Sequence, residues 1–93
     1  MKIKLTVEFK YDLKEIVDFI SKDKPIAARK FKNELKKSIQ KDLKHPFLFK
    51  KSIYFEDESI RDYVFKVYTV VFKVDNDLEL VSVTAILKHR ISF

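Results

Sequence analysis

The sequence contains no glycine, and this absence excludes whole classes of function. P-loop and dinucleotide-binding proteins use glycine-rich loops to bring backbone amides against a phosphate. A chain of 93 residues without a single glycine is therefore not expected to bind nucleotides in that way. Asp, Asn, Ser, Lys or Pro must instead form every turn. In the segment Asp75-Asn76-Asp77, we expect Asn76 to adopt the left-handed conformation that glycine usually takes.

Cysteine is also missing, which excludes disulfides, thiolate zinc sites and cysteine nucleophiles together and is typical of a reducing compartment. The only two histidines are His45 and His89, and no spaced carboxylate cluster accompanies them. We therefore expect no metal and no other cofactor. No uncharged run approaches the roughly 18 residues that a membrane span needs, and no signal-peptide pattern is present. We expect a cytoplasmic protein that does not bind membranes.

The residues that are present can form one hydrophobic core. Hydrophobic residues make up 46% of the chain and include nine Phe and four Tyr, which argues against disorder. We expect a single domain over residues 1–93. The net charge of +6 is concentrated in residues 22–51, which hold eleven basic and three acidic groups. Such a segment attracts a polyanion or an acidic protein, although a solvated lysine-rich helix face has the same composition.

The hydrophobic periodicity of the first half predicts a strand followed by two helices. Lys2–Phe9 alternates apolar and polar residues, which indicates a half-buried strand. A helical spacing then predicts a first helix from about Tyr11 or Asp12 to Ser21. A second helix is expected from about Pro25 to the residues before His45-Pro46. Its apolar stripe consists of Ala28, Phe31, Leu35, Ile39 and Leu43.

The second half is rich in β-branched and aromatic residues and predicts strands. Ile60–Phe65, Val67–Val74 and Leu78–Leu87 are expected to form a meander, with a short additional strand over Ser52–Phe55. The resulting order is β-α-α-β-β-β. We therefore predict an α+β fold in which an α-helical hairpin packs on one face of a twisted antiparallel sheet.

A cationic cluster follows the last predicted strand and is a candidate catalytic site. Lys88, His89 and Arg90 can bind a phosphate. During phosphodiester cleavage, a His or Lys can move a proton while an Arg stabilises the developing negative charge. The alternative is a sheet edge that charge protects from aggregation, with Phe93 packing back on the core. Arg61 follows an acidic turn and presents a similar choice between a functional role and a salt bridge.

Several short motifs of this chain occur in a known order and spacing. They are Asp12-Leu13 with Ile16, Asp23-Lys24-Pro25, the stripe of the second predicted helix, His45-Pro46, Ile60-Arg61, Tyr68 with Phe72, and His89-Arg90. Together they resemble the RelE/ParE superfamily of bacterial toxin-antitoxin toxins, and its ParE-like, plasmid-stabilisation branch in particular. The resemblance covers essentially the whole chain. That family usually carries glycine in its loops, and this chain departs from the pattern.

The resemblance implies a toxin that a cognate antitoxin neutralises by folding a disordered segment over its helices and sheet. RelE-like members enter the ribosome and cleave mRNA, whereas ParE-like members act on DNA gyrase and lack the nuclease residues. For a RelE-like nuclease, the implied catalytic residues are Lys88, His89, Arg90 and Arg61. The implied contacts with an anion, RNA or another target are Lys66, Tyr68, Phe93, Arg29, Lys36 and Lys37.

The two branches differ at positions that this chain can be compared with. RelE-like nucleases commonly carry an Arg at the position that resembles Thr69 here, so this threonine favours the gyrase inhibitor. His89 with Phe93 resembles a His and Phe pair of some nucleases and keeps the mRNA interferase as an alternative. A third hypothesis is a non-catalytic basic domain that binds nucleic acid or an acidic protein through its second helix.

Overall fold

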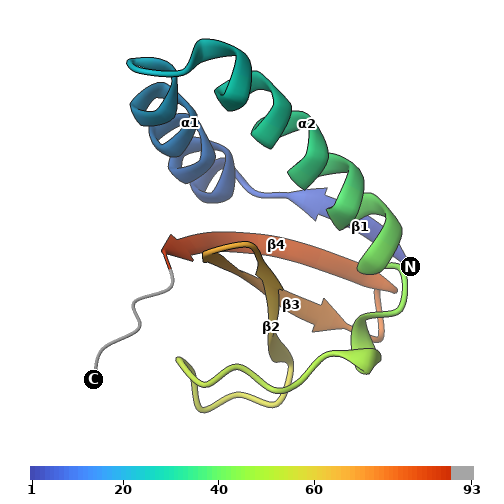
Figure 1. Ribbon diagram of the computed structural model, residues 1–93. Helices are drawn as coiled ribbons and strands as arrows, with labels where there is room; N and C mark the ends of the chain where they lie inside the picture. Colours follow the sequence, from blue (N-terminus) through green and yellow to red (C-terminus); the bar gives the residue numbers. More distant parts are fainter. Residues whose placement is uncertain (89–93) are drawn as a thin grey trace.

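The computed structural model describes residues 1–88 and confirms the predicted element order. The helical hairpin covers one face of the sheet, and the segment between η1 and β2 runs past its other side (Figure 1). This two-layer arrangement is the predicted α+β class. The elements are β1 (Lys2–Leu5), α1 (Val7–Ser21), α2 (Pro25–Asp42), η1 (Pro46–Leu48), β2 (Ile60–Phe65), β3 (Tyr68–Asp75) and β4 (Leu80–Lys88).

The four strands form one sheet in the order β1-β4-β3-β2. The pairs β2–β3 and β3–β4 are antiparallel, as predicted. β1 is instead parallel to β4, with Ile3 opposite Val81, so the sheet is mixed. An alternating pattern specifies which face of a strand is buried and carries no information about the direction of its neighbour. The sequence pattern therefore could not predict that β1 and β4 are parallel.

The first strand is shorter and the first helix longer than predicted. α1 begins at Val7, because Thr6 caps the helix by accepting a hydrogen bond from the Phe9 N–H at 3.2 Å. Phe9 is fully buried and lies four residues before Leu13 on the same helical face. The predicted strand over residues 6–9 was wrong because Phe9 fits both the period of a strand and that of a helix.

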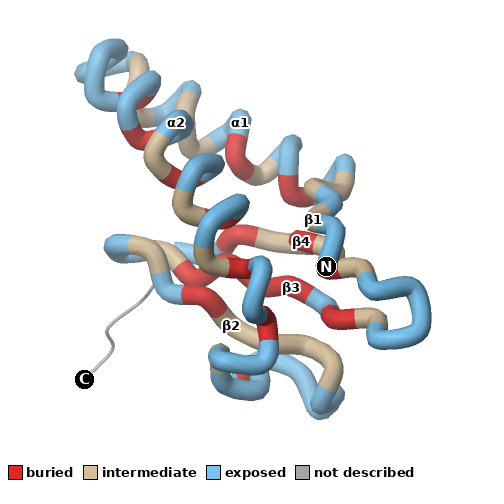
Figure 2. Tube along the Cα trace, turned by 90° about the vertical axis from the view of Figure 1, so that its right-hand side faces the viewer, coloured by how far each residue is buried: buried red, intermediate tan, exposed pale blue. Residues whose placement is uncertain are grey.

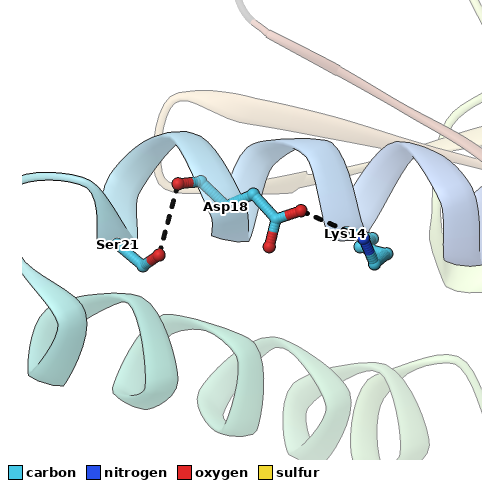
Figure 3. Close-up of polar contacts among 3 residues, drawn as sticks. All are labelled: Lys14, Asp18 and Ser21. Atoms are coloured by element: carbon cyan, nitrogen blue, oxygen red, sulfur yellow. Dashed lines mark hydrogen bonds and ion pairs between the residues drawn. The ribbon is translucent and has the colours of Figure 1, made fainter.

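The second half of α1 carries local polar contacts between exposed side chains. Lys14 Nζ lies 3.2 Å from Asp18 Oδ2 in an exposed ion pair, and Ser21 Oγ donates a hydrogen bond to Asp18 O at 3.3 Å (Figure 3). Exposed pairs of this kind contribute about 0.2–1 kcal/mol at most. The hairpin is therefore held mainly by its apolar face.

The hydrophobic core lies between the helical layer and the sheet. The whole predicted stripe of α2 is buried, including Leu43 directly after the helix. Buried positions recur along both helices and along β3 and β4 (Figure 2). The remaining members of the core cluster are Phe9, Leu13, Tyr63, Val70, Phe72, Val74, Val81, Val83 and Ile86.

Two turns adopt left-handed backbone conformations without glycine. Lys66 (φ 55°) is the first residue of the two-residue turn between β2 and β3. Glu79 (φ 49°) is the last residue before β4. The expectation for Asn76 was wrong, because the turn extends to Glu79 and its start is closed by a hydrogen bond from Leu78 N–H to Asp75 Oδ1 at 3.0 Å. The left-handed residue is therefore needed at the end of the turn.

The short strand predicted over Ser52–Phe55 is absent from the described structure, where Lys51 alone forms a bridge, to Arg61. Side-chain oxygens accept the backbone N–H groups that a neighbouring strand would otherwise bind. Asp62 Oδ2 accepts the Ile53 N–H, and Ser52 Oγ accepts the Tyr54 N–H, both at 3.2 Å. These bonds satisfy the backbone locally and favour a loop over a strand.

Candidate functional site

Three of the predicted site residues, the contact residues Lys66 and Tyr68 and the catalytic candidate Lys88, lie together at one end of the sheet. Tyr68 lies opposite Lys88 on β4 and opposite Phe65 on β2, and Lys66 follows Phe65 in the turn. The Tyr68 ring is half-buried and packs against Phe31 of α2, with 5.3 Å between ring centroids. Two exposed lysines therefore flank an aromatic ring that the core holds in place.

Acidic side chains accompany both lysines at this end of the sheet. Lys66 Nζ donates a hydrogen bond to Glu34 Oε2 of α2 at 3.1 Å. Lys88 lines an open groove of about 420 Å³ together with Asp12 and Glu15 of α1. Acidic side chains therefore lie near both lysines at this end of the sheet. His89, Arg90 and Phe93 lie outside the described residues, so their predicted roles stay predictions.

Arg61 anchors the segment that follows η1. Its Nη1 donates a hydrogen bond to the Phe49 carbonyl oxygen at 2.6 Å, and its guanidinium carbon lies 5.2 Å from the centre of the Phe47 ring. The alternative that the sequence offered, a salt bridge to the acidic turn, is not formed among residues 1–88. Through these contacts, Arg61 holds Phe47 and Phe49 against β2.

The structure does not bring Arg61 and Lys88 together. Arg61 lies opposite Phe72 on one side of β3, and Lys88 lies opposite Tyr68 on the other. Four residues of a strand span about 13 Å, and the Arg61 guanidinium is held at Phe49. Arg61 and Lys88, the predicted catalytic residues that the structure describes, therefore do not converge on one phosphate in this arrangement.

Thr69 lies on the face of the sheet opposite the helices. Its neighbours Tyr68 and Val70 belong to the helix-facing side, so Thr69 points the other way. There it is 1% exposed and lies beside Val64 and Tyr54 in a groove beneath the η1–β2 loop. The sequence comparison singled out this position but gave no signal of its burial, since the residues that cover it are distant in the chain.

α2 exposes the densest positive charge of the described chain. Arg29, Lys36 and Lys37, all predicted contact residues, lie on its solvent-facing side. They line a shallow depression in which Glu34 is the only acidic residue. A surface of this kind attracts acidic partners over a distance of about one Debye length, roughly 8–10 Å. We call it the α2 cationic face, formed by Arg29, Lys30, Lys36, Lys37, Lys41 and Lys44.

Two further features are absent from the part of the chain that the structure describes. Residues 1–88 contain no group of three or more His, Asp or Glu side chains that could hold a metal ion. Over the same residues, no helix has the length and apolarity that crossing a membrane requires.

Comparison with known proteins gives two kinds of match. A family profile described as "ParE toxin of type II toxin-antitoxin system, parDE" matches residues 3–93. A chain of the chromosomal ParDE system from P. aeruginosa has the same fold, with a TM-score of 0.80, 16% identity and 97% of each chain covered. A chain of the toxin-antitoxin complex RelBE2 from Mycobacterium tuberculosis gives a TM-score of 0.64, 17% identity and 96% coverage of each chain. No curated protein matches the sequence.

Proposed function

This chain belongs to the ParE toxin family of type II toxin-antitoxin systems, and on that basis we propose that it inhibits bacterial growth by acting on DNA gyrase. The family match, which spans residues 3–93, is the observation that carries the proposal. The ParDE chain of the same fold supports it. We further propose that a cognate antitoxin is the partner that neutralises it.

The arrangement of the sheet supports a gyrase inhibitor over a nuclease. Thr69, which by resemblance matches the position of an arginine in RelE-like nucleases, is buried on the face opposite the helices. Arg61 is bonded to Phe49 and lies far from Lys88. A nuclease needs cations that converge on the scissile phosphate, and Arg61 and Lys88 do not form such a pair.

A ribosome-dependent mRNA interferase is the second candidate. Lys88 ends β4 as an exposed residue beside Tyr68 and directly precedes His89-Arg90 in the sequence. Stacking of an unpaired base on an aromatic side chain is a common mode of RNA contact. The shared fold with a chain of a RelBE2 complex is consistent with this candidate.

Induction of the protein in growing bacteria separates the two candidates. We expect growth arrest with accumulation of linearised plasmid, as for a gyrase poison, and no codon-positioned cuts when translated mRNA is analysed by primer extension. Such cuts, if they disappear in His89→Ala, would establish the nuclease. Unaffected growth combined with salt-resistant binding to duplex DNA would instead support the non-catalytic binding domain.

The α2 cationic face provides a test of the antitoxin proposal. We expect the triple variant Arg29→Glu, Lys36→Glu and Lys37→Glu to associate with the cognate antitoxin about 10–100-fold more slowly at low salt, since complementary charge accelerates encounter. The difference should shrink at about 0.5 M salt, because screening shortens the range of the field. Surface plasmon resonance at several salt concentrations measures both effects.

The matched control reverses three exposed lysines on the sheet, Lys2, Lys4 and Lys73. This control lowers the net charge by the same amount as the triple variant, but on the sheet and not on the α2 cationic face. If both variants slow association equally, the total charge of the chain matters and the α2 cationic face has no special role.

A further inference from the structure

The cations of the α2 cationic face lie in two rows along the helix. An α-helix turns by about 100° per residue, so residues seven positions apart point in nearly the same direction. Arg29 and Lys36 form one such pair, and Lys30 and Lys37 form another. All four are exposed, and exposed positions recur along the whole of α2 (Figure 2). Two rows of positive charge therefore run along the outside of the helix.

Neutral amide side chains occupy the strip between these two rows. Asn33 and Gln40 are also seven residues apart, and both are exposed and line the same shallow depression as the cations. By helical geometry, Asn33 points about 40° away from Arg29 on one side and about 40° away from Lys37 on the other. The face therefore consists of a central row of hydrogen-bonding amides with cations on both flanks.

The acidic residue of this depression, Glu34, leaves the pattern intact. It follows Asn33 directly, and adjacent residues of a helix point about 100° apart, so Glu34 lies at the margin of the face. Its carboxylate oxygens lie 3.1 Å from Lys66 Nζ and 3.9 Å from Lys30 Nζ. Neighbouring lysines therefore offset its negative charge.

The opposite margin of the face carries further positive charge. Lys36 also borders a groove between α1 and α2, and Lys10 and Lys32 line the same groove. Both are exposed. Asp18 lies in this groove as well, but it already forms an ion pair with Lys14 at 3.2 Å. The positive surface therefore continues from α2 onto α1.

We propose that the α2 cationic face binds duplex DNA, with α2 along the major groove, the cationic rows at the phosphates of the two strands, and Asn33 and Gln40 facing the base edges. An α-helix with its side chains is about 10–12 Å wide, and the major groove of B-DNA is about 12 Å wide. From Arg29 to Lys41 the helix axis covers about 18 Å, a length over which a duplex carries on the order of ten negative charges. The proposal goes beyond the proposed function and holds for a gyrase inhibitor and an mRNA interferase alike.

A DNA duplex fits this face better than a disordered acidic segment of a protein. A segment that folds on binding must offset its lost conformational entropy, usually by burying apolar side chains. Among the described residues that line the depression, only Ile26 is apolar. A duplex is ordered beforehand, and release of its counterions by lysines and arginines favours binding without apolar contacts. Steering of an antitoxin depends on the field at a distance and does not require the antitoxin to bind at this face.

Titration of a labelled DNA duplex of about 16 base pairs with the full chain, followed by fluorescence anisotropy, tests the proposal. We expect a Kd of roughly 10⁻⁴–10⁻⁶ M near physiological salt and a linear fall of log K with log salt. The combined variant Arg29→Ala, Lys36→Ala and Lys37→Ala should bind at least tenfold more weakly. Its salt slope should be smaller by about 2.7, because each lost phosphate contact removes about 0.9. A chain that does not bind the duplex even at about 50 mM salt would overturn the proposal.

The matched control is the combined variant Lys2→Ala, Lys4→Ala and Lys73→Ala, which removes three exposed lysines from the sheet. We expect its affinity to stay within about threefold of the unmodified protein and its salt slope to change by less than about 1. Circular dichroism verifies that every variant is folded. Equal losses in the two triple variants would show that total charge alone binds DNA, and the proposal would be wrong.

A second variant tests whether α2 lies in the groove. Asn33→Ala with Gln40→Ala should bind DNA about threefold more weakly or less with an unchanged salt slope, because the amides carry no charge and contact base edges. A duplex RNA of the same sequence should bind at least tenfold more weakly than DNA, because the major groove of RNA is too deep and narrow for side chains to read. An amide variant that binds as the unmodified protein does, or RNA that binds as well as DNA, would contradict this placement and overturn the proposal.

Competition with poly-glutamate distinguishes DNA from an acidic protein as the partner of this face. At equal total charge, we expect poly-glutamate to displace the labelled duplex at least tenfold less effectively than unlabelled DNA, because it has no groove that admits a helix and a lower charge density. If poly-glutamate competes as well as DNA does, the α2 cationic face binds acidic polypeptides and the DNA proposal fails.

Discussion

Replacing Phe72 with alanine is expected to lower the free energy of unfolding by about 3–5 kcal/mol. Phe72 is fully buried in the middle of β3, where it meets Phe49 edge-on with 6.0 Å between ring centroids. Its removal leaves a cavity between the helical layer and the sheet. A domain of this size has a total stability of roughly 5–15 kcal/mol, so this single change removes a large part of it. Urea denaturation followed by circular dichroism measures the loss.

Phe19→Ala is the matched control because it removes the same side chain from the exposed end of α1, where Phe19 is 73% exposed. We expect its effect to stay within about 0.5 kcal/mol. Equal losses for the two variants would contradict the placement of Phe72 at the centre of the core.

The second large effect is expected for Tyr63→Phe, at about 1.5–3 kcal/mol near neutral pH. The Tyr63 hydroxyl donates a hydrogen bond to Asp42 Oδ2 at 2.5 Å and so joins β2 to the last turn of α2. Tyr63 is only 7% exposed, so phenylalanine leaves the acceptor without its donor and keeps the ring packing. Tyr11→Phe, which removes an exposed hydroxyl, is the control and should change stability by less than about 0.5 kcal/mol.

The contribution of Tyr63 should also depend on pH in a defined direction. Burial, and then the hydrogen bond to Asp42 and its charge, raise the pKa of Tyr63 from 10.0 to about 12. The folded state therefore favours the protonated phenol, and the contribution is complete below pH 10. It is lost as the pH rises from about 10 to about 12. A difference between the unmodified protein and Tyr63→Phe that stays constant across this range would contradict the assignment.

The helical stripe of α2 was predictable because its core residues are local in sequence. Phe31, Leu35 and Ile39 recur at the period of a helix, and packing against any apolar layer buries them. The same holds for β2, whose predicted bounds, Ile60–Phe65, match the structure. The cationic character of α2 could likewise be inferred, since charge adds up along a segment without knowledge of the fold.

Features that depend on contacts between distant residues could not be predicted in this way. The grouping of Lys66, Tyr68 and Lys88 follows from the register of three strands. The anchoring of Arg61 at Phe49 needs the path of the loop. The strand expected at Ser52–Phe55 failed for the same reason, because Asp62, on a separate strand, supplies the acceptor that makes a loop stable there. The roles predicted for His89, Arg90 and Phe93 remain to be tested by the induction experiment.

The pairing of β1 with β4 has a consequence for when the protein can become active. β1, the first strand, pairs only with β4, the last strand of the described residues, and Leu5 lies opposite Val83. The helical hairpin needs only local contacts and can form early, but the sheet cannot close until β4 has been translated and released. At about 5–20 residues per second, synthesis of residues 1–88 takes roughly 4–18 s, and the sheet of the toxin stays incomplete for that time.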